Sequence, residues 1–491
     1  MEPLLLAIDQ GTTSSRAFVF DTKGAIVSSA QAEFPQLYPQ PGWVEHDPEA
    51  IWTTSLATAR SALEQAESQG GQVIGIGIAN QRETCVIWDR RTQKPISNAI
   101  VWQDRRTSET CQRLKSDGLE PSISEKTGLL LDPYFSATKV SWILDHIDGA
   151  RQLASDGHLA FGTVDAFLLS RLTGNAHLTD ATNAARTSLF SIYNNEWDDD
   201  LCRAFNVPSS VLPEVYDTVA EFGHTQKDLF GRSIPILAMV GDQQAAAAGQ
   251  ACFTKGDVKS TYGTGCFIIA ETGDHGPQSN NRLLTTISRR IDGEVSYALE
   301  GSIFVAGASV QWLRDELGMV SSAAETEEIA AKIQSTSGVY LVPAFVGLGA
   351  PHWVADARGA LVGLTRGAGR AQIVRATLES TAYQTFDLLE AMERDGAKVS
   401  ILKVDGGMAA NDWLMQFLAD ICNVVVERPK VLETTASGAA LLAGYGAGLF
   451  DGLENSAEMR DMDCRFEPMM HESARNDLIG GWRNALEAVL S

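Results

Sequence analysis

Asp9-Gln10-Gly11-Thr12-Thr13-Ser14-Ser15-Arg16 is the stretch of sequence that decides the fold of this chain. Apolar residues flank it at 4–8 and 17–20, so the pattern predicts two short strands joined by a tight turn. The glycine lets backbone N–H groups approach an anion closely, while hydroxyl groups and exposed amides supply donors around its oxygens. We therefore interpret this stretch as a phosphate-binding hairpin.

A second hairpin of the same kind occurs about half the chain later. Residues 258–262 predict a strand, Gly263-Thr264-Gly265 a turn, and residues 266–270 a second strand. One such hairpin alone is also compatible with an ordinary tight turn, but two copies favour a clamp for a nucleotide. The carboxylate of Asp9 cannot hold a bare phosphate. Its place beside the first turn therefore indicates a bridging cation, and Mg²⁺ is the usual one in phosphoryl transfer.

The composition limits what the chain can do. Its 491 residues are too many for one core and predict two or more large domains. The net charge of −23 argues against a nucleic-acid or anionic-membrane surface, because such surfaces need clustered Lys and Arg. No apolar stretch reaches the length of a membrane span, and the seven scattered Cys indicate neither a disulfide framework nor a zinc site. We expect a cytoplasmic protein with no nucleic-acid partner and no membrane insertion.

The order of the predicted elements indicates α/β domains. Residues 25–33 predict a third strand after the first hairpin, and residues 48–69 a helix with Asp47 as its N-cap. A buried strand at 73–79 then delivers Asn80-Gln81-Arg82-Glu83 at its carboxyl end, where open α/β sheets bind ligands. The later half repeats this plan, so we place one domain at 1–250 and a second at 251–491. In that half we expect strands at 294–300 and 401–404 and helices at 308–316 and 372–394.

A third glycine-rich turn, Asp405-Gly406-Gly407-Met408-Ala409-Ala410-Asn411, follows the strand expected at 401–404 and opens a helix. Its glycines permit close approach by a flat or anionic group, and the Asn411 amide is suited to hydrogen-bond a nucleoside. Taken alone, this is also a common strand-to-helix turn. Its place after two phosphate hairpins favours the nucleotide interpretation.

These three turns, in this order, resemble the superfamily of sugar kinases, actins and heat-shock chaperone ATPases. The resemblance implies an α/β fold of two ribonuclease-H-like domains, each a mixed five-stranded sheet flanked by helices, with an interdomain cleft that closes on ATP. Further segments narrow it to the FGGY carbohydrate kinases, and within them to the members that phosphorylate glycerol, up to about Leu449. These segments are 42–48 (GWVEHDP), 80–84 (NQRET), 100–103 (IVWQ), 132–136 (DPYFS), 241–244 (GDQQ), 261–266 (TYGTGC) and 347–351 (GLGAP).

The resemblance implies ATP-dependent phosphorylation of glycerol to sn-glycerol 3-phosphate. Glycerol is a small neutral triol, so its site needs polar groups for three hydroxyls and apolar groups for its carbon side. Arg82 and Glu83 offer donors and acceptors for vicinal hydroxyls, although by their sequence alone they are also compatible with a surface ion pair. By similarity, the acceptor is held by Arg82, Glu83, Tyr134, Asp242 and Gln243 and covered by Trp102 and Phe267.

Asp242 is the residue that we expect to act as general base. It stands between the apolar run 236–240 and the Ala-rich segment 245–248, which places it where a strand enters a helix. In a loose phosphoryl-transfer transition state, the carboxylate mainly orients the attacking hydroxyl and accepts its proton late. Helix N-capping is the alternative role for an Asp at this position.

On the nucleotide side, the resemblance assigns residues from both domains. Asp9 is expected to orient Mg²⁺ through water molecules. ATP is expected to bind largely on the second domain and glycerol on the first, so that closure of the two excludes water. The resemblance also implies a homodimer or homotetramer. The residues assigned to ATP or ADP are Thr12, Thr13, Ser14, Arg16, Thr264, Gly307, Gln311, Gly407 and Asn411.

Two other functions stay open at this point. The first is an FGGY kinase for another polyol or a ketopentose, although xylulose kinases are expected to carry Met-His-Gly where this chain has Gln81-Arg82-Glu83. The second is an actin-like nucleotide switch without an acceptor, which would not need Arg82, Glu83 and Asp242 together. The sequence assigns no role to residues 450–491 and does not decide whether the activity is under allosteric control.

Overall fold

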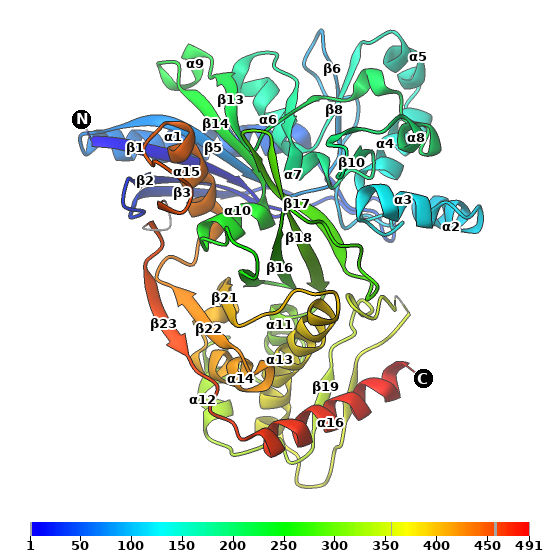
Figure 1. Cartoon of the computed structure of the whole chain (residues 1–491), viewed down its shortest axis with the longest axis vertical. Helices are drawn as coiled ribbons and strands as arrows, with labels where there is room; N and C mark the ends of the chain where they lie inside the picture. The colour runs from blue at the N-terminus through cyan, green and yellow to red at the C-terminus, as the bar shows by residue number, and fades with distance from the viewer. Residues whose placement is uncertain (1, 355, 456–458, 491) are drawn as a thin grey trace.

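The computed structural model describes residues 2–354, 356–455 and 459–490, and within them two mixed β-sheets carry the fold (Figure 1). The first sheet has six strands in the order β13-β14-β5-β1-β2-β3, and the second has seven in the order β17-β18-β16-β15-β21-β22-β23. The strands of the first are β1 (Glu2–Gln10), β2 (Ser14–Asp21), β3 (Ile26–Glu33), β5 (Gly71–Asn80), β13 (Val219–His224) and β14 (Pro235–Gly241). Those of the second are β15 (Val258–Tyr262), β16 (Cys266–Gly273), β17 (Leu284–Ile291), β18 (Glu294–Ile303), β21 (Ile401–Asp405), β22 (Val425–Pro429) and β23 (Met462–Phe466).

The expectation of two α/β domains with mixed sheets is confirmed, but five strands for each sheet was wrong. The first sheet carries one further edge strand, β13 against β14, and the second carries two, β17 against β18 and β23 against β22, all antiparallel. The sequence pattern is weak in β13 and β23. These strands are short and contain polar residues or glycine, as edge strands commonly do, so the alternation of apolar residues that marks a strand is faint in them.

The helices of the first half cover its sheet and build the insertion between β5 and β13. Helix α1 (Pro48–Ser68) begins as predicted, since the Asp47 side chain accepts a hydrogen bond from the N–H of Glu49 and Pro48 occupies the first turn. The other helices are α2 (Ser108–Ser116), α3 (Glu120–Thr127), α4 (Ser136–His146), α5 (Ala150–Ser155), α6 (Val164–Thr173), α7 (Ala181–Ala184), α8 (Asp199–Ala204), η1 (Ser209–Val211), α9 (Lys227–Phe230) and α10 (Asp242–Gly249). Short strands are β4 (Glu45–His46), β6 (Val86–Asp89), β7 (Ala99–Ile100), β8 (Leu159–Gly162), β9 (Leu178–Asp180), β10 (Phe190–Ser191), β11 (Glu196–Trp197) and β12 (Glu214–Tyr216).

The second half contains the long helix expected at 372–394, which runs as α13 (Arg370–Arg394). The helix expected at 308–316 is α11 (Gly307–Asp315), and the strand expected at 401–404 is β21. The remaining elements are α12 (Glu325–Ala331), β19 (Tyr340–Val342), β20 (Ala360–Val362), η2 (Gly407–Ala410), α14 (Asp412–Cys422), α15 (Thr434–Gly446) and α16 (Glu472–Leu490).

Both predicted hairpins are present. In the first, β1 and β2 run antiparallel and Asp9 faces Arg16 across the ladder. In the second, β15 and β16 run antiparallel and Tyr262 faces Cys266. Each hairpin therefore lies inside its own sheet, with its turn at the sheet edge.

The parallel strands bring their carboxyl ends to one edge of each sheet. In the first sheet, Gln10 of β1 and Gly241 of β14 are both in register with Asn80 of β5. In the second sheet, Thr261 of β15 is in register with Asp405 of β21. Residues that follow these strands are thus held at common sheet edges, which is where α/β folds bind ligands.

Helix α15 from the second half packs on the first sheet and against α10, as Figure 1 also shows. Small residues make this approach close: a Cβ atom on Gly438 would clash with the backbone of Ala245, and one on Gly77 would clash with the backbone of Ala439. The two halves of the chain are therefore joined through a tight helix contact as well as through the chain itself.

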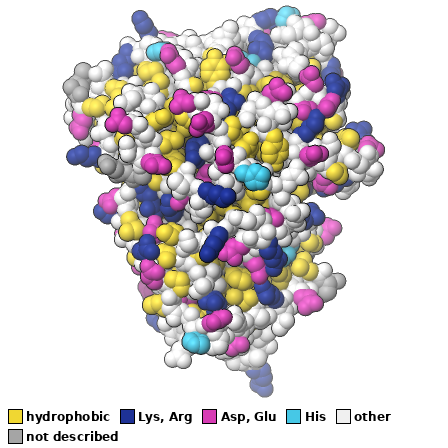
Figure 2. Space-filling model, viewed as in Figure 1, with side chains coloured by type: hydrophobic (Ala, Val, Ile, Leu, Met, Phe, Trp, Pro, Cys, Tyr) yellow, Lys and Arg dark blue, Asp and Glu magenta, His cyan; other side chains and the backbone are white. Residues whose placement is uncertain are grey.

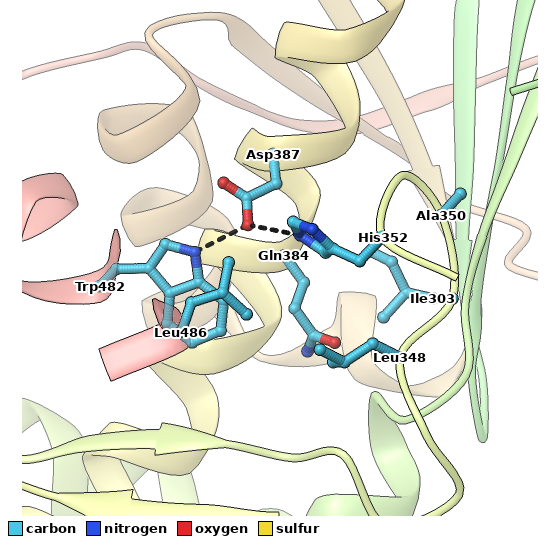
Figure 3. A pocket seen from close by; sticks show the side chains of 9 residues that line it. Ile303, Leu348, Ala350, His352, Gln384, Asp387, Trp482 and Leu486 are labelled. Atoms are coloured by element: carbon cyan, nitrogen blue, oxygen red, sulfur yellow. Dashed lines mark hydrogen bonds and ion pairs between the residues drawn. The ribbon is translucent and has the colours of Figure 1, made fainter. Parts of the chain in front are cut away.

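Residues after 450, to which the sequence assigned no role, include β23 and α16. Helix α16 buries Ile479 and Trp482 in the core of the second half. The Trp482 indole N–H donates to Asp387 Oδ2 at 2.8 Å, and His352 Nε2 lies 3.7 Å from the same oxygen, beside a small pocket (Figure 3). This end of the chain completes the second core.

On the face drawn in Figure 2, acidic and basic side chains are interspersed over both lobes. The described residues contain no helix whose length and apolar character would allow it to cross a bilayer.

Candidate functional site

The acceptor residues predicted from the sequence come together at the carboxyl edge of the first sheet. Arg82 and Glu83 follow β5, and Asp242 follows β14 as the first residue of α10. Arg82 Nε lies 3.3 Å from Asp242 Oδ1. Gly241 makes room for this arrangement, because a Cβ atom there would lie 2.6 Å from Arg82 Cδ.

Arg82 and Glu83 are buried, at 3% and 1% exposure, so the alternative of a surface ion pair was wrong. The N-cap alternative for Asp242 is also not borne out, since Gly241 occupies the N-cap position of α10. The Asp242 side chain is 29% exposed. A partly exposed carboxylate between buried charges is accessible to a small ligand.

Three aromatic rings form a wall beside these charges. The ring centroids of Trp102 and Tyr134 lie 5.5 Å apart, and those of Trp102 and Phe267 lie 6.3 Å apart. Phe267 belongs to β16 of the second sheet, whereas Trp102 and Tyr134 come from the first half. The wall therefore contains side chains from both halves of the chain.

Two buried ionic residues that the sequence analysis missed complete this cluster. Glu300 of β18 accepts hydrogen bonds from Arg82 Nη1 at 2.7 Å and Arg82 Nη2 at 2.8 Å. Arg186 donates from Nε to Glu83 Oε1 at 2.6 Å and from Nη2 to Glu300 Oε1 at 3.2 Å. A charge at position 300, directly after the apolar residues Tyr297, Ala298 and Leu299, was the available signal, because a buried charge needs a partner.

Burial and the neighbouring cations shift the pKa values of the carboxylates in opposite directions. Burial raises the pKa of Asp242 above its ordinary value, and the charges of Arg82 and Lys259 partly oppose it. Burial would also raise the pKa of Glu300, but Arg186 and Arg82 more than offset this and hold that pKa at about 2. The two arginines thus favour the ionised form of Glu300, whereas the raised pKa of Asp242 suits a proton acceptor.

Lys259 of β15 is a third residue that the sequence analysis missed. Its ammonium is buried and donates to Gln243 Oε1 at 2.5 Å, to Thr261 Oγ1 at 2.7 Å and to the Phe267 carbonyl at 3.4 Å. Burial lowers its pKa, while Asp405 and Asp242 raise it. Lys259 joins the Asp242–Gln243 segment to the second hairpin.

The first hairpin lies next to the aromatic wall. Asp9 is buried and its carboxylate accepts a hydrogen bond from Arg16 Nη2 at 2.6 Å; Arg16 also pairs with Glu433. The Trp102 indole N–H donates to Thr12 Oγ1 at 3.0 Å. Thr13 is exposed, while Ser14 is buried and accepts from Gln31 Nε2 at 3.3 Å.

The second hairpin, the start of α11 and the third turn form one unit. The N–H groups of Gly307 and Ala308 donate to the carbonyls of Gly263 and Thr264 at 2.9 and 3.0 Å. A Cβ atom on Gly307 would lie 2.5 Å from the Gly263 carbonyl oxygen, and one on Gly406 would lie 2.5 Å from that of Tyr262. Gly406 also has a φ of +86°, which favours glycine.

The other residues assigned to ATP belong to the same three segments. Thr264, Gln311 and Gly407 are exposed. The side-chain oxygen of Asn411 accepts from the N–H of Leu414 at 2.9 Å and so caps α14, and its amide donates to Thr326 Oγ1 at 3.4 Å. The amide nitrogen of Asn411 has a second N–H, so this bond leaves one donor for a nucleotide.

The carboxylates of the site are the groups that a cation would bind. Among the described residues, no three His, Cys, Asp or Glu side chains gather as a metal-binding group. A Mg²⁺ ion does not require such a group, because it commonly binds through one or two carboxylates, water and substrate phosphates. Asp9 is one such carboxylate, and Arg16 joins it to a second, that of Glu433.

Models of a known family match both halves of the chain. The N-terminal domain of the FGGY family of carbohydrate kinases matches residues 4–249, and the C-terminal domain of the same family matches residues 258–447. The chain belongs to the FGGY family of carbohydrate kinases. As a member of a family of carbohydrate kinases, the chain is a phosphotransferase.

Curated relatives of this FGGY kinase extend over its full length. It is 58% identical over 490 residues to the glycerol kinase of Rhodospirillum centenum, covering 100% of this chain and 98% of the relative. It is 56% identical over 495 residues to that of Allorhizobium ampelinum, covering 100% of both chains.

Solved structures also match this FGGY kinase along the whole chain. The glycerol kinase of Plasmodium falciparum, solved with ADP, has a TM-score of 0.94 at 37% identity and covers 100% of this chain and 99% of its own. The gluconate kinase of Lactobacillus acidophilus has a TM-score of 0.89 at 21% identity, with 99% and 98% covered. At that identity, the second match shows the shared fold alone.

Proposed function

We propose that this FGGY kinase transfers the γ-phosphoryl group of ATP to the 3-hydroxyl of glycerol and forms sn-glycerol 3-phosphate. The observation that carries the proposal is the convergence of Arg82, Glu83 and Asp242 beside three aromatic rings. Such a site offers several hydrogen-bonding groups and one apolar wall, which suits a small neutral triol. The names of relatives at 58% and 56% identity support the same substrate.

The acceptor is held on its polar side by Arg82, Glu83, Asp242 and Gln243, with Tyr134 as a further hydrogen-bonding group. Trp102, Tyr134 and Phe267 cover its carbon atoms. Because the polar groups are mostly buried, an analogue that lacks a hydroxyl leaves one of them without a partner and binds less well.

Asp242 orients the attacking hydroxyl and accepts its proton as the bond to phosphorus forms. Its partial exposure supports contact with the substrate, and its raised pKa suits a proton acceptor. Arg82, at 3.3 Å, stabilises the carboxylate before the transfer.

The nucleotide phosphates bind between the two hairpins, with Thr12, Thr13, Ser14 and Arg16 on one side and Thr264 on the other. Gly307, Gln311, Gly407 and Asn411 hold the remainder of ATP beside α11 and the third turn. Asp9 would hold Mg²⁺ through water, and that ion, when bound, neutralises charge on the phosphate oxygens. Arg16 links Asp9 to Glu433, so it keeps the buried carboxylate oriented.

We further propose two domains at 1–250 and 251–491 that close on the substrates, and a homodimer or homotetramer in the cytoplasm. Closure would exclude water that otherwise hydrolyses ATP. Light scattering of the purified protein tests the oligomer, and fractionation of its host cells tests the location.

The experiment that tests the proposed activity measures ADP release from Mg-ATP with glycerol, other polyols, ketopentoses or no acceptor. The proposal predicts fast release with glycerol and slow release in its absence. Preference for another polyol or a ketopentose would contradict the substrate. Equal release without any acceptor would contradict the transfer reaction and favour a nucleotide switch.

A further inference from the structure

Four charged side chains meet in the interior beside the acceptor site. Arg82, Glu83, Arg186 and Glu300 are exposed by 3%, 1%, 0% and 0%. Two are cations and two are anions, so the group is neutral as a whole. Taking ions out of water is costly unless each one is paired and hydrogen-bonded, and here each cation contacts an anion. The four charges are stable in the interior because each one is paired with an opposite charge.

Glu300 fixes the plane of the Arg82 guanidinium. The two form a bidentate pair at 2.7 and 2.8 Å, and Arg82 Nη1 donates to Gln244 Oε1 at 3.2 Å. A guanidinium has five N–H donors. These three bonds leave one N–H on Nη2, together with the N–H on Nε that faces Asp242. Glu300 thereby decides which donors of Arg82 are left for the acceptor.

Arg186 fixes the carboxylate of Glu83 in a similar way. Glu83 has a φ of +60°, an uncommon conformation for a residue other than glycine, which must be supported by its surroundings. Arg186 Nε donates to Glu83 Oε1 at 2.6 Å, and the Ser136 hydroxyl donates to the Glu83 carbonyl at 3.0 Å. Both the backbone and the side chain of Glu83 are therefore held in place.

The two pairs are coupled because Arg186 also donates to Glu300 at 3.2 Å. Glu300 is 218 residues from Arg82 and lies on the second sheet, where Leu284 of β17 and Ile269 of β16 are its neighbours across the ladder. The second half of the chain thus reaches into the polar side of the acceptor site, which the sequence assigned to the first half.

We infer that Glu300 and Arg186 are positioning residues for the acceptor, and that Glu300 is the contribution of the second sheet to recognition of the triol. Neither is proposed to touch the reacting atoms. Glu300 holds Arg82 and Arg186 holds Glu83, so that the remaining donors and acceptors match the spacing of vicinal hydroxyls. This inference rests on the proposed glycerol-phosphorylating activity.

The first test replaces Glu300 with glutamine, which keeps the shape but removes the charge. Glu300→Gln is expected to raise the KM for glycerol at least tenfold while the KM for ATP changes less than twofold. The preference for glycerol over propane-1,3-diol, measured as a ratio of kcat/KM values, is expected to fall at least fivefold. A role confined to folding would not produce this split between the two substrates.

Glu379→Gln is the matched control. Glu379 of α13 is also a buried anion paired with an arginine, at 2.7 Å from Arg375 Nε, and lies outside the acceptor group. Its variant is expected to lose thermal stability while keeping both KM values within twofold. Comparing the two variants distinguishes the general effect of losing a buried charge from the specific effect of losing the charge of Glu300.

If Glu300→Gln does not fold, Arg186→Lys tests the positioning role instead. Lysine keeps the positive charge but cannot bridge Glu83 and Glu300 with one planar group. This variant is expected to raise the KM for glycerol at least fivefold. The inference is overturned if the unaltered enzyme phosphorylates glycerol and the folded variants keep its KM within twofold. It is also overturned if the KM for ATP rises equally. If the unaltered enzyme does not phosphorylate glycerol, the proposed function fails first and this inference falls with it.

Discussion

The ammonium of Lys259 donates a 2.5 Å hydrogen bond to the side-chain oxygen of Gln243, the residue next to Asp242. Lys259 lies on β15 of the second sheet, whereas Gln243 belongs to α10 after the first sheet. The same ammonium donates to Thr261, two residues before the turn of the second hairpin. A single buried cation therefore joins the segment of the proposed base to the hairpin proposed to hold phosphate.

Replacing Lys259 with methionine removes this cation while keeping a side chain of similar length. We expect Lys259→Met to lower kcat at least tenfold, because Asp242 and the second hairpin lose their common partner. Lys259 also lowers the pKa of Asp242, so its removal raises that pKa further. The acid limb of the kcat/KM profile is expected to move to higher pH, which rate measurements between pH 5 and 9 detect.

Lys403→Met is the control for this prediction. Lys403 of β21 is partly buried and donates to Asp257 at 3.1 Å and to the Ala251 carbonyl at 2.9 Å, outside the proposed site. We expect its variant to keep the position of the acid limb. An equal displacement in both variants would contradict the role of Lys259 beside Asp242.

Replacing Asp242 with asparagine removes the proposed proton acceptor. Asp242→Asn is expected to lower kcat by about 100- to 10,000-fold, the range that general-base catalysis supplies, and to leave ATP affinity within a few fold. Turnover and nucleotide titration measure the two quantities separately. Asp165→Asn, another buried carboxylate that accepts hydrogen bonds from Thr163 and Thr179, is the control and is expected to keep kcat. Near-normal turnover of Asp242→Asn would remove this residue from the role.

The activity is also expected to depend on pH through Asp242. A base acts in its ionised form, and burial raises the pKa of this carboxyl above its ordinary value of 3.8. Activity should therefore fall as the pH drops through a pKa higher than 3.8, and the falling limb should disappear in Asp242→Asn. A profile of kcat/KM for glycerol checks both expectations. A limb that persists unchanged in the variant belongs to another group.

Gly307 leaves no room for a side chain where α11 meets the second hairpin. Gly307→Ala would place a Cβ atom 2.5 Å from the Gly263 carbonyl oxygen. We expect the KM for ATP to rise about tenfold or more while the KM for glycerol changes little. Gly480→Ala is the control, since a Cβ atom on this residue of α16 would meet no atom within 4 Å. If the two variants behave alike, the contact does not shape the nucleotide site.

Trp102 connects the aromatic wall with the first hairpin through its hydrogen bond to Thr12 at 3.0 Å. Trp102→Phe keeps an aromatic ring but removes this bond, which is worth about 1 kcal/mol, or about a factor of five. We expect the KM for glycerol to rise by roughly that factor, and Trp102→Ala to raise it further because the wall itself is lost. Steady-state kinetics with glycerol as the varied substrate checks the order of the two effects.

The sequence predicted the framework because each part had a local signal. The apolar runs around Asp9 and Gly263 gave both hairpins, and Asp47-Pro48 gave the start of α1. The number of strands was wrong because edge strands such as β13 and β23 show little alternation. Their places are decided by pairing with distant strands, which a local pattern does not contain.

The residues of the candidate site also fall into a group that the sequence predicted and a group that it missed. Arg82, Glu83 and Asp242 follow strand ends and were predicted, and the structure brings them together. Arg186, Lys259 and Glu300 were missed because their partners are far away in the chain, up to 218 residues for Glu300 and Arg82. Lys259 and Glu300 are nevertheless charges inside buried strands, which was a signal that such partners exist.

The most direct test of the central claim follows the phosphorus nuclei during incubation of the purified enzyme with Mg-ATP and glycerol. Phosphorus NMR should show the γ-phosphate signal of ATP replaced by that of a glycerol monoester. A stereospecific dehydrogenase assay should then identify the whole product as sn-glycerol 3-phosphate. Appearance of inorganic phosphate instead of the ester, or of the ester at another position, would contradict the account.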